Sequence, residues 1–151
     1  IERPLHIGAA LAGAGPSVHA AYTAYGLPLG EAFQMRDDIL GVFGDPAETG
    51  KPAGDDLREG KRTVLIATAV QRASPDQTAA MRTHLGDPAL DASGIETLRS
   101  IIRDTGALAH AEEQIEVRLA QALEAARNPA IEPSAQEVLT GLAHAATRRS
   151  V

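Results

Sequence analysis

Hydrophobic residues recur at helical spacing along the whole chain and are interrupted by short runs of glycine and proline. Apolar positions from Leu5 to Ala12 predict a first helix, which the Gly13–Pro16 run ends. We expect Ser17 to cap a second helix that continues to Tyr25. Gly26 and Pro28 then predict a break, because glycine is flexible and proline lacks the backbone N–H that a helix interior needs.

A third helix is predicted over Leu29–Phe43, and its polar side is narrow. At about 100° per residue, the polar and glycine positions fall within an arc of roughly 120°. These positions are Gly30, Glu31, Gln34, Asp37, Asp38 and Gly41. Apolar residues fill nearly all the remainder, with Arg36 as the single charged exception. A mostly buried helix that keeps one carboxylate stripe is typical of a cavity wall, and the alternative is an ordinary amphipathic helix with an acidic outer face.

The next segment, Gly44–Gly60, holds four glycines and two prolines and shows no helical periodicity. Loops of this length in compact domains are usually functional or disordered. Glycine lets backbone N–H groups approach anionic oxygens, and lysine pairs with phosphate as a mobile point charge. Lys51 and Lys61 are therefore candidate phosphate-binding residues, and the alternative is that both are solvated surface lysines.

The rest of the chain predicts further helices separated by clear turn signals. They cover Thr63–Arg72, Ser74–His84, Ser93–Asp104, a long helix between Gly106 and Asn128, and a last helix after Pro133. In the long helix the predicted core stripe is Leu108, Ile115, Leu119, Leu123 and Ala126. In the last helix we expect Val138, Leu142 and Ala145 on the inner side.

Composition supports an all-α fold in one domain. The 151 residues are 44% hydrophobic, which is enough for a core, and the whole chain, residues 1–151, is predicted to belong to a single domain. Two phenylalanines, two tyrosines and no tryptophan favour close-packed helices over a β-sandwich.

Charge and motif content exclude several classes of function. A net charge of −6 gives no general field for a nucleic-acid backbone, and the absence of cysteine excludes disulfides and thiolate chemistry. The longest apolar run, Ile7–Gly15, is too short to span a bilayer, so we expect a cytoplasmic protein without stable membrane insertion. The histidines form no His-x-x-x-His pair, the serines no G-x-S-x-G elbow, and proline after Lys51 rules out a nucleotide-binding P-loop.

Carboxylates on a buried helix, followed by lysines in a glycine-rich loop, favour a magnesium-bridged diphosphate. Magnesium prefers carboxylate, water and phosphate oxygens, and Asp37 and Asp38 supply such carboxylates. Magnesium and lysine together stabilise the charge that builds on a departing diphosphate. An apolar cavity around the site would shelter a carbocation from water.

These residues resemble the trans-isoprenyl diphosphate synthases, also called polyprenyl synthetases. Phe33-Gln34-x-x-Asp37-Asp38-x-Leu40 is similar to the second aspartate-rich motif of that family. The following loop, FGDPAETGKPAGDDLREGKRT, is similar to actinobacterial members that include geranylgeranyl and longer-chain synthases. The resemblance covers essentially the whole chain and corresponds to roughly the C-terminal half of a member. It implies an all-α helical bundle of the isoprenoid synthase type, here an incomplete C-terminal portion.

The resemblance also implies residue roles. Asp37 would bind Mg²⁺ directly, with Asp38 as a further metal residue and Gln34 assisting through waters or hydrogen bonds. Lys51 and Lys61 would contact the allylic diphosphate. Asp56 would support metal-bound waters or the loop, and Phe33 would wall the isopentenyl site. The implied reaction joins isopentenyl diphosphate to an allylic diphosphate without a covalent enzyme intermediate, and the full-length form is expected to be a homodimer.

Two departures from the family pattern shape the hypotheses. Gly41 stands where the motif commonly has a third aspartate, and no first aspartate-rich motif is present. The chain starts at Ile1-Glu2-Arg3-Pro4 as if within a helix, so we expect a fragment that is inactive alone and comes from an active prenyltransferase. The alternative is a non-catalytic partner subunit or remnant that binds diphosphate or packs against a homologue. A class I terpene cyclase is disfavoured, because its Asn/Ser/Glu metal motif is not found.

Overall fold

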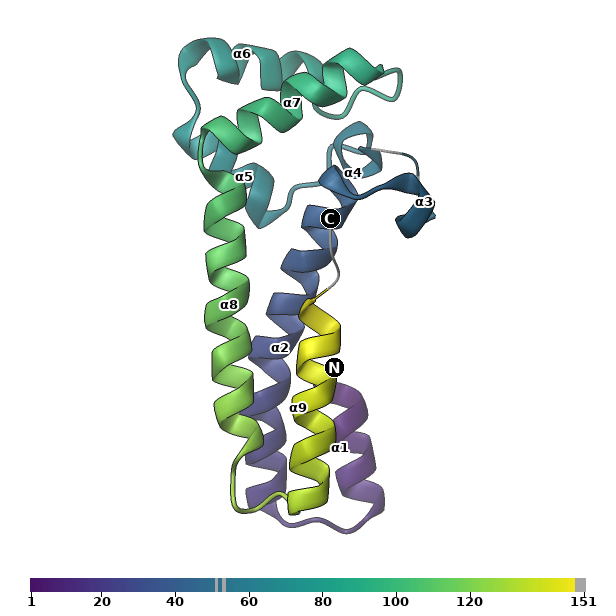
Figure 1. Cartoon of the computed structure of the whole chain (residues 1–151), viewed down its shortest axis with the longest axis vertical. Coiled ribbons are helices and arrows are strands. Elements are labelled where there is room, and N and C mark those ends of the chain that lie inside the picture. Colours follow the sequence, from purple (N-terminus) through teal and green to yellow (C-terminus); the bar gives the residue numbers. More distant parts are fainter. Residues whose placement is uncertain (51, 53, 149–151) are drawn as a thin grey trace. The chain divides into compact units, whose positions relative to one another are not determined.

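The computed structural model describes residues 1–50, 52 and 54–148. Within these ranges the chain forms nine helices and no strand, which confirms the all-α prediction. Figure 1 labels these helices. The helices group into two compact units. The first unit contains Ile1–Gln34 and the described residues from Gln114 onward, and the second contains Met35–Glu113.

The helix boundaries follow the predicted turns closely except in two places. The helices are α1 (Glu2–Leu11), α2 (Pro16–Phe43), α3 (Pro46–Thr49), α4 (Asp55–Arg58), α5 (Val64–Arg72), α6 (Pro75–His84), α7 (Ala92–Asp104), α8 (Ala107–Ala126) and α9 (Pro133–Thr147). The differences are the continuity of α2 and the short helices α3 and α4 inside the predicted loop.

The predicted break at Gly26 and Pro28 is wrong, because α2 continues through both residues. The helix also begins at Pro16, so Ser17 lies in its first turn and is not its cap. Gly26 serves close packing, since a β-carbon there would lie 2.8 Å from the backbone of Glu2 in α1. Pro28 removes one helical hydrogen bond, but complete burial of neighbouring apolar side chains on α2 compensates for that loss.

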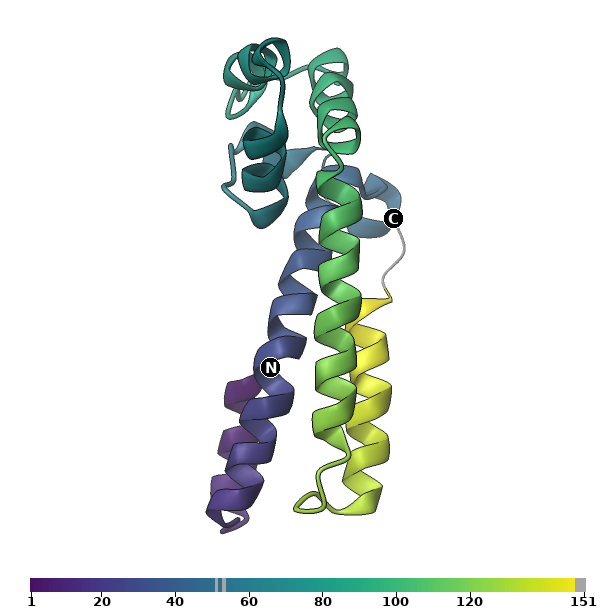
Figure 2. The same cartoon turned by 90° about the vertical axis from the view of Figure 1, so that its left-hand side faces the viewer.

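The first unit is a small helical bundle. It consists of α1, α9, the first part of α2 and the last part of α8, which lie side by side (Figures 1 and 2). Its buried core contains Ala21, Tyr25, Leu29, Leu119, Ala122, Ala126, Ile131, Leu139 and Ala143. The hydroxyl of Tyr25 donates a hydrogen bond of 2.7 Å to the carbonyl oxygen of Leu139. A buried aromatic ring thus fixes α2 against α9 and still satisfies its polar end.

A second connection within the first unit joins α1 to α2 through two histidines. The rings of His6 and His19 stack with centroids 5.1 Å apart, and their Nδ1 atoms lie 2.8 Å from each other. The Nε2 atom of His6 lies 2.9 Å from the hydroxyl of Thr23. Both histidines are partly buried, and no pattern in the sequence predicts their pairing.

The predicted inner side of the last helix is wrong. Val138 is 69% exposed and Leu142 47% exposed, and Ala145 is exposed as well. Leu139 and Ala143 face the core instead, one residue further along the helix. The hydrogen bond from Tyr25 to Leu139 and the small size of Ala143 favour close approach of this side of α9. The core stripe predicted for α8 is largely confirmed, with Ile115, Leu119 and Ala126 buried and Leu108 and Leu123 partly buried.

Side chains cap the N-termini of α5, α6 and α7 in the second unit. The Thr63 side chain accepts a hydrogen bond from Ile66 N–H, and the Ser74 side chain forms a capping box with Gln77. Asp91 caps α7 through the N–H of Gly94.

None of the helices in the described segments combines the length and apolar character that crossing a bilayer requires.

Candidate functional site

The carboxylates singled out from the sequence lie in the last turns of α2, within the second unit. Asp38 is only 5% exposed, and Asp37 is partly buried. Ile39 and Val42 on the same helix are almost completely buried and hold this part of α2 in the unit. The carboxylates at the C-terminal end of the polar stripe are therefore partly or almost completely buried, whereas Glu31 and Gln34, earlier in the stripe, are exposed.

The end of α2 is fixed by arginines of α7. Arg99 donates a hydrogen bond of 2.8 Å from Nε to the carbonyl oxygen of Val42. The guanidinium groups of Arg99 and Arg103 lie 5.9 and 5.0 Å from the ring centre of Phe43. Positive charge at a helix C-terminus is favourable, and both cations also face the π-electrons of the ring.

The segment after α2 is more regular than predicted. Asp45 accepts a hydrogen bond of 2.8 Å from Ala47 N–H and so caps the single turn α3. Gly50 and Gly54 have φ angles of 69° and 68°, which favour glycine, and α4 follows Gly54. The prediction of a segment without helix was wrong because such single turns are too short to produce a hydrophobic period.

The α4 turn is anchored to the segment between α6 and α7. Leu57 is fully buried, and its carbonyl oxygen accepts a hydrogen bond of 2.9 Å from Gly86 N–H. Arg58 donates from Nε to the carbonyl oxygen of Leu90 at 3.1 Å. A β-carbon at Gly60 would lie 3.0 Å from the backbone of Gly86, so these two glycines permit close contact. The anchors fix the position of Asp56, which is 6% exposed.

Lys61 connects the two buried carboxylates. Its ammonium nitrogen lies 3.3 Å from Asp38 Oδ1 and 3.0 Å from Asp56 Oδ2. Its backbone N–H donates to the carbonyl oxygen of Asp56, also at 3.0 Å. The hydrogen bond to Asp56 raises the pKa of Lys61, burial partly opposes this effect, and the nearby charges of Asp56 and Asp38 add to it. The lysine is thus held as a cation between α2 and α4.

A further ion pair that the sequence did not reveal supports the same part of α2. Arg36 is 9% exposed and donates to both carboxylate oxygens of Glu112 on α8, at 2.8 and 2.6 Å. This bidentate geometry gives the strongest form of ion-paired hydrogen bonding. Arg36, the single charged exception on the apolar side of the predicted helix, therefore has a structural partner.

The structure brings together three of the residues predicted from the sequence: Asp38, Asp56 and Lys61. Asp37 neighbours them on α2. Phe33 is partly buried and Gln34 is exposed, and both belong to the first unit. Lys51 lies outside the described residues. The functional roles of all these residues stay predictions.

The carboxylates near Lys61 could supply only some of the ligands of a magnesium ion, with water and phosphate oxygens as the others. Among the described residues, no group of three or more His, Cys, Asp or Glu side chains could hold a metal ion. Magnesium usually keeps several waters and binds through one or two carboxylates together with phosphate oxygens. The carboxylates of Asp37, Asp38 and Asp56 suit that mode, because each offers hard oxygen ligands and two of them are almost completely buried.

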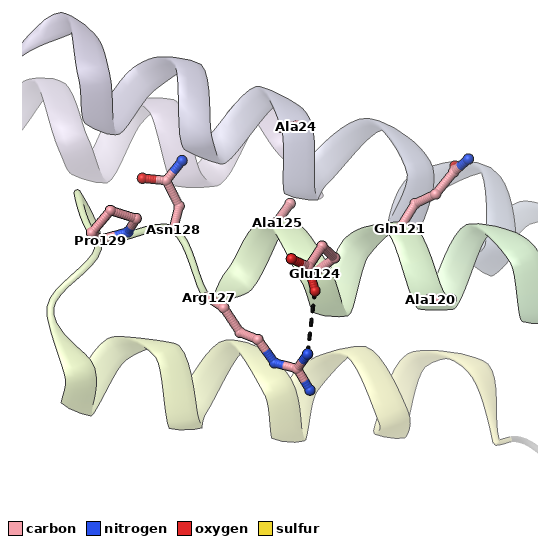
Figure 3. A pocket seen from close by; sticks show the side chains of 8 residues that line it. All are labelled: Ala24, Ala120, Gln121, Glu124, Ala125, Arg127, Asn128 and Pro129. Atoms are coloured by element: carbon pink, nitrogen blue, oxygen red, sulfur yellow. Dashed lines mark hydrogen bonds and ion pairs between the residues drawn. The ribbon is translucent and has the colours of Figure 1, made fainter.

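A separate hollow of about 710 Å³ lies in the first unit, and Figure 3 shows its lining. Its residues are Ala24, Ala120, Gln121, Glu124, Ala125, Arg127, Asn128 and Pro129. The charged side chains Glu124 and Arg127 pair with each other at 3.2 Å. None of the residues predicted for diphosphate chemistry lines this hollow, so it is not the candidate site.

The helical fold and the cluster of Asp38, Asp56 and Lys61 define an all-α protein whose charged site is built from one helix and the loop that follows it. The family model described as polyprenyl synthetase matches residues 1–102. The chain therefore belongs to the polyprenyl synthetase family.

Individual relatives agree with this assignment. The chain is 39% identical over 140 residues to geranylfarnesyl diphosphate synthase from Aeropyrum pernix, covering 92% of this chain and 43% of that protein. Its fold matches the crystal structure of geranylgeranyl pyrophosphate synthase from Corynebacterium glutamicum, complexed with isoprenyl diphosphate and magnesium, with a TM-score of 0.94. That match has 45% identity and covers 99% of this chain and 43% of the other. The expected isoprenoid synthase type of fold is confirmed.

A third relative bears on the metal. Polyprenyl synthase from Caulobacter crescentus, solved with calcium and isoprenyl diphosphate, matches with a TM-score of 0.80 and 34% identity. The match covers 95% of this chain and 44% of that one. The family is metal-dependent. The chain thus spans less than half the length of the relatives it matches here.

Proposed function

We propose that this chain is the diphosphate-binding portion of a trans-prenyltransferase, which condenses isopentenyl diphosphate with an allylic diphosphate and releases diphosphate. The observation that carries the proposal is Lys61, whose ammonium group lies between the buried carboxylates of Asp38 and Asp56. A cation fixed beside hard oxygen ligands suits a polyanionic substrate and its metal. The relatives, named as prenyl diphosphate synthases, support the same activity.

In the proposed site, Asp37 and Asp38 hold Mg²⁺, and Gln34 and Asp56 support it through waters or hydrogen bonds. Magnesium, when bound, supplies positive charge that stabilises the departing diphosphate. Lys51 and Lys61 bind the allylic diphosphate, and Phe33 lines the isopentenyl site. The buried surroundings of Asp38 strengthen these electrostatic interactions, because water is largely excluded there.

The proposed reaction needs no covalent bond to the protein. The allylic carbon–oxygen bond breaks and its electron pair leaves on the diphosphate. The double bond of isopentenyl diphosphate then attacks the allylic carbon, and loss of a proton restores a double bond in the product. In this scheme Lys61 contributes by neutralising charge on the leaving diphosphate. We place the reaction in the cytoplasm and in a homodimer of the full-length parent.

One observation favours a second candidate function. Val138 and Leu142 are 69% and 47% exposed and form apolar surface on α9. A non-catalytic partner subunit that binds diphosphate or packs against a homologue would expose such a surface. Product formation by the full-length parent separates the candidates, because a non-catalytic subunit would form none.

The first test replaces Asp37 in the full-length parent. Asp37→Ala removes a proposed metal ligand, so we expect turnover at saturating magnesium to fall by about a hundredfold or more. The matched control is Asp104→Ala, which removes an exposed carboxylate at the end of α7. Turnover is measured with isopentenyl diphosphate and dimethylallyl, geranyl or farnesyl diphosphate. Wild-type activity in Asp37→Ala would refute the assignment of this residue.

The second test concerns Lys61. Lys61→Ala removes the ammonium group between the two carboxylates, so we expect weaker binding of a non-hydrolysable allylic diphosphate analogue, by about tenfold. Calorimetry at fixed magnesium concentration measures the affinity. Arg82→Ala, which removes an exposed cation on α6, is the control. Unchanged affinity in Lys61→Ala would make this residue a structural ion-pair partner only.

A further inference from the structure

The space above Gly41 on α2 is filled by a carboxylate. A β-carbon built at Gly41 would lie 2.5 Å from the carboxylate carbon of Asp56 and 3.0 Å from its Oδ1 atom, and it would overlap Oδ2. The obstructing group is not free to move aside, because Asp56 is 6% exposed and bound to Lys61. Any side chain at position 41 would therefore have to displace this carboxylate.

Gly30 is the comparison for this feature, whereas Gly26 is closely approached by the backbone of Glu2 and not by a carboxylate oxygen. A β-carbon added to Gly30, on the same helix, would have nothing within 4 Å of it. Both glycines have ordinary helical backbone angles, since neither is among those with positive φ. Glycine in a helix interior is less stable than alanine, so its presence at position 41 calls for a reason. Room for Asp56 is such a reason at Gly41, and no contact of that kind exists at Gly30.

We propose that Gly41 is a positioning residue: its missing side chain lets the Asp56 carboxylate pack onto α2 in the turn after Asp38, where Lys61 joins the two. Gly41 lies three residues after Asp38 and thus on the same side of the helix. Asp56 thereby brings to this side of α2 a carboxylate that the helix itself lacks at position 41. The consequence for cation and diphosphate binding rests on the proposed function, whereas the packing does not.

A double-mutant cycle tests the packing without any ligand. Gly41→Ala in the wild-type background is expected to lower the folding equilibrium constant by about tenfold or more, because two groups compete for one space. In the Asp56→Ala background the obstruction is gone, and the same change should raise the folding equilibrium constant by a few-fold, as we also expect for Gly30→Ala. Urea denaturation measures all of these proteins. An equal effect of Gly41→Ala in both backgrounds would overturn the proposal.

Magnesium-dependent binding of a non-hydrolysable allylic diphosphate analogue to the full-length parent tests the positioning role. Gly41→Ala should weaken binding by about tenfold, and Gly30→Ala should leave it unchanged. The exchange variant, Gly41→Asp with Asp56→Ala, returns a carboxylate to the same space from α2 and should restore affinity to within about threefold of wild type. Weak binding by Gly41→Ala that the exchange variant does not restore would overturn the role, as would wild-type binding by Gly41→Ala.

The outcomes separate this proposal from the proposed function. Failure of the wild-type parent to bind the analogue at any magnesium concentration would refute the proposed function. The stability cycle would still decide whether Gly41 holds Asp56 in place, since it needs neither metal nor substrate. Two results together would support both the positioning role of Gly41 and the proposed function. They are an effect of Gly41→Ala on stability that depends on Asp56, and restored analogue binding in the exchange variant.

Discussion

At the scale of single residues, Tyr25 gives the clearest dependence of stability on pH. Burial raises its pKa from 10.0 to about 12, while in the unfolded chain the phenol ionises near its ordinary value. The folded state therefore keeps a proton that the unfolded state loses, so stability is complete below pH 10 and falls as pH rises towards about 12. We expect Tyr25→Phe to show a flatter decline, measured by urea denaturation between about pH 9 and 12.

The same comparison contains its own control. The pKa of Lys61 is also raised, so its ion pairs are fully present below the ordinary lysine value of 10.5 and are lost at higher pH. This loss occurs in wild type and in Tyr25→Phe, and it cancels when the two are subtracted. Identical slopes in the two proteins would show that ionisation of Tyr25 does not limit alkaline stability.

Residue chemistry could be predicted from the sequence, but residue pairing could not. Asp38 and Lys61 were candidates because their types and local pattern suit metal and phosphate, and Asp56 was a candidate through the family resemblance. That one ammonium lies between both carboxylates depends on how α4 is anchored to Gly86 and Leu90, distant positions with no local signal. Arg36 and Glu112 are separated by 76 residues, and no local pattern links them.

At the scale of elements, glycines on α2 allow a prediction with a matched control. Gly26→Ala would place a β-carbon 2.8 Å from the backbone of Glu2, so α1 must shift. We expect a loss of about 1–3 kcal/mol in the free energy of unfolding. Gly30→Ala meets no neighbour within 4 Å and should stabilise the helix by about 0.5–1 kcal/mol. Chemical denaturation measures both, and a stabilising Gly26→Ala would contradict tight packing of α1 on α2.

Two of the element-level errors have a common cause. Local rules place a break at Pro28 and the inner side of α9 at Val138, but tertiary packing overrides both. Burial of Tyr25 and Leu29 compensates for the hydrogen bond that Pro28 removes. On α9, apolar residues occur on two sides, so periodicity alone could not choose between Val138 and Leu139. Helices with strong caps were predicted correctly, because a cap is a local feature of the sequence. An example is α6, which follows its N-cap residue Ser74.

At the scale of the whole molecule, the sequence predicts the all-α class and the family, but it does not predict the division into two compact units. The units divide within α2, after Gln34, and within α8, after Glu113. Because each division falls inside a continuous helix, no turn or linker in the sequence marks it. Helix type follows from local periodicity, whereas grouping of helices depends on long-range contacts. The charged cluster of Asp38, Asp56 and Lys61 lies wholly within one unit, so its geometry can be tested without knowledge of the other.

The last prediction concerns the activity of the 151-residue chain by itself. Its sequence contains one aspartate-rich motif, around Asp37 and Asp38, and it spans 43% of the Corynebacterium relative. A departing diphosphate needs charge stabilisation on every side that its oxygens face. One pair of carboxylates that hold a metal ion, together with Lys61, supplies only part of that stabilisation. We therefore expect no product when the chain is incubated with magnesium, labelled isopentenyl diphosphate and an allylic diphosphate. The full-length parent is the positive control, and turnover by the short chain at a comparable rate would show that these residues suffice.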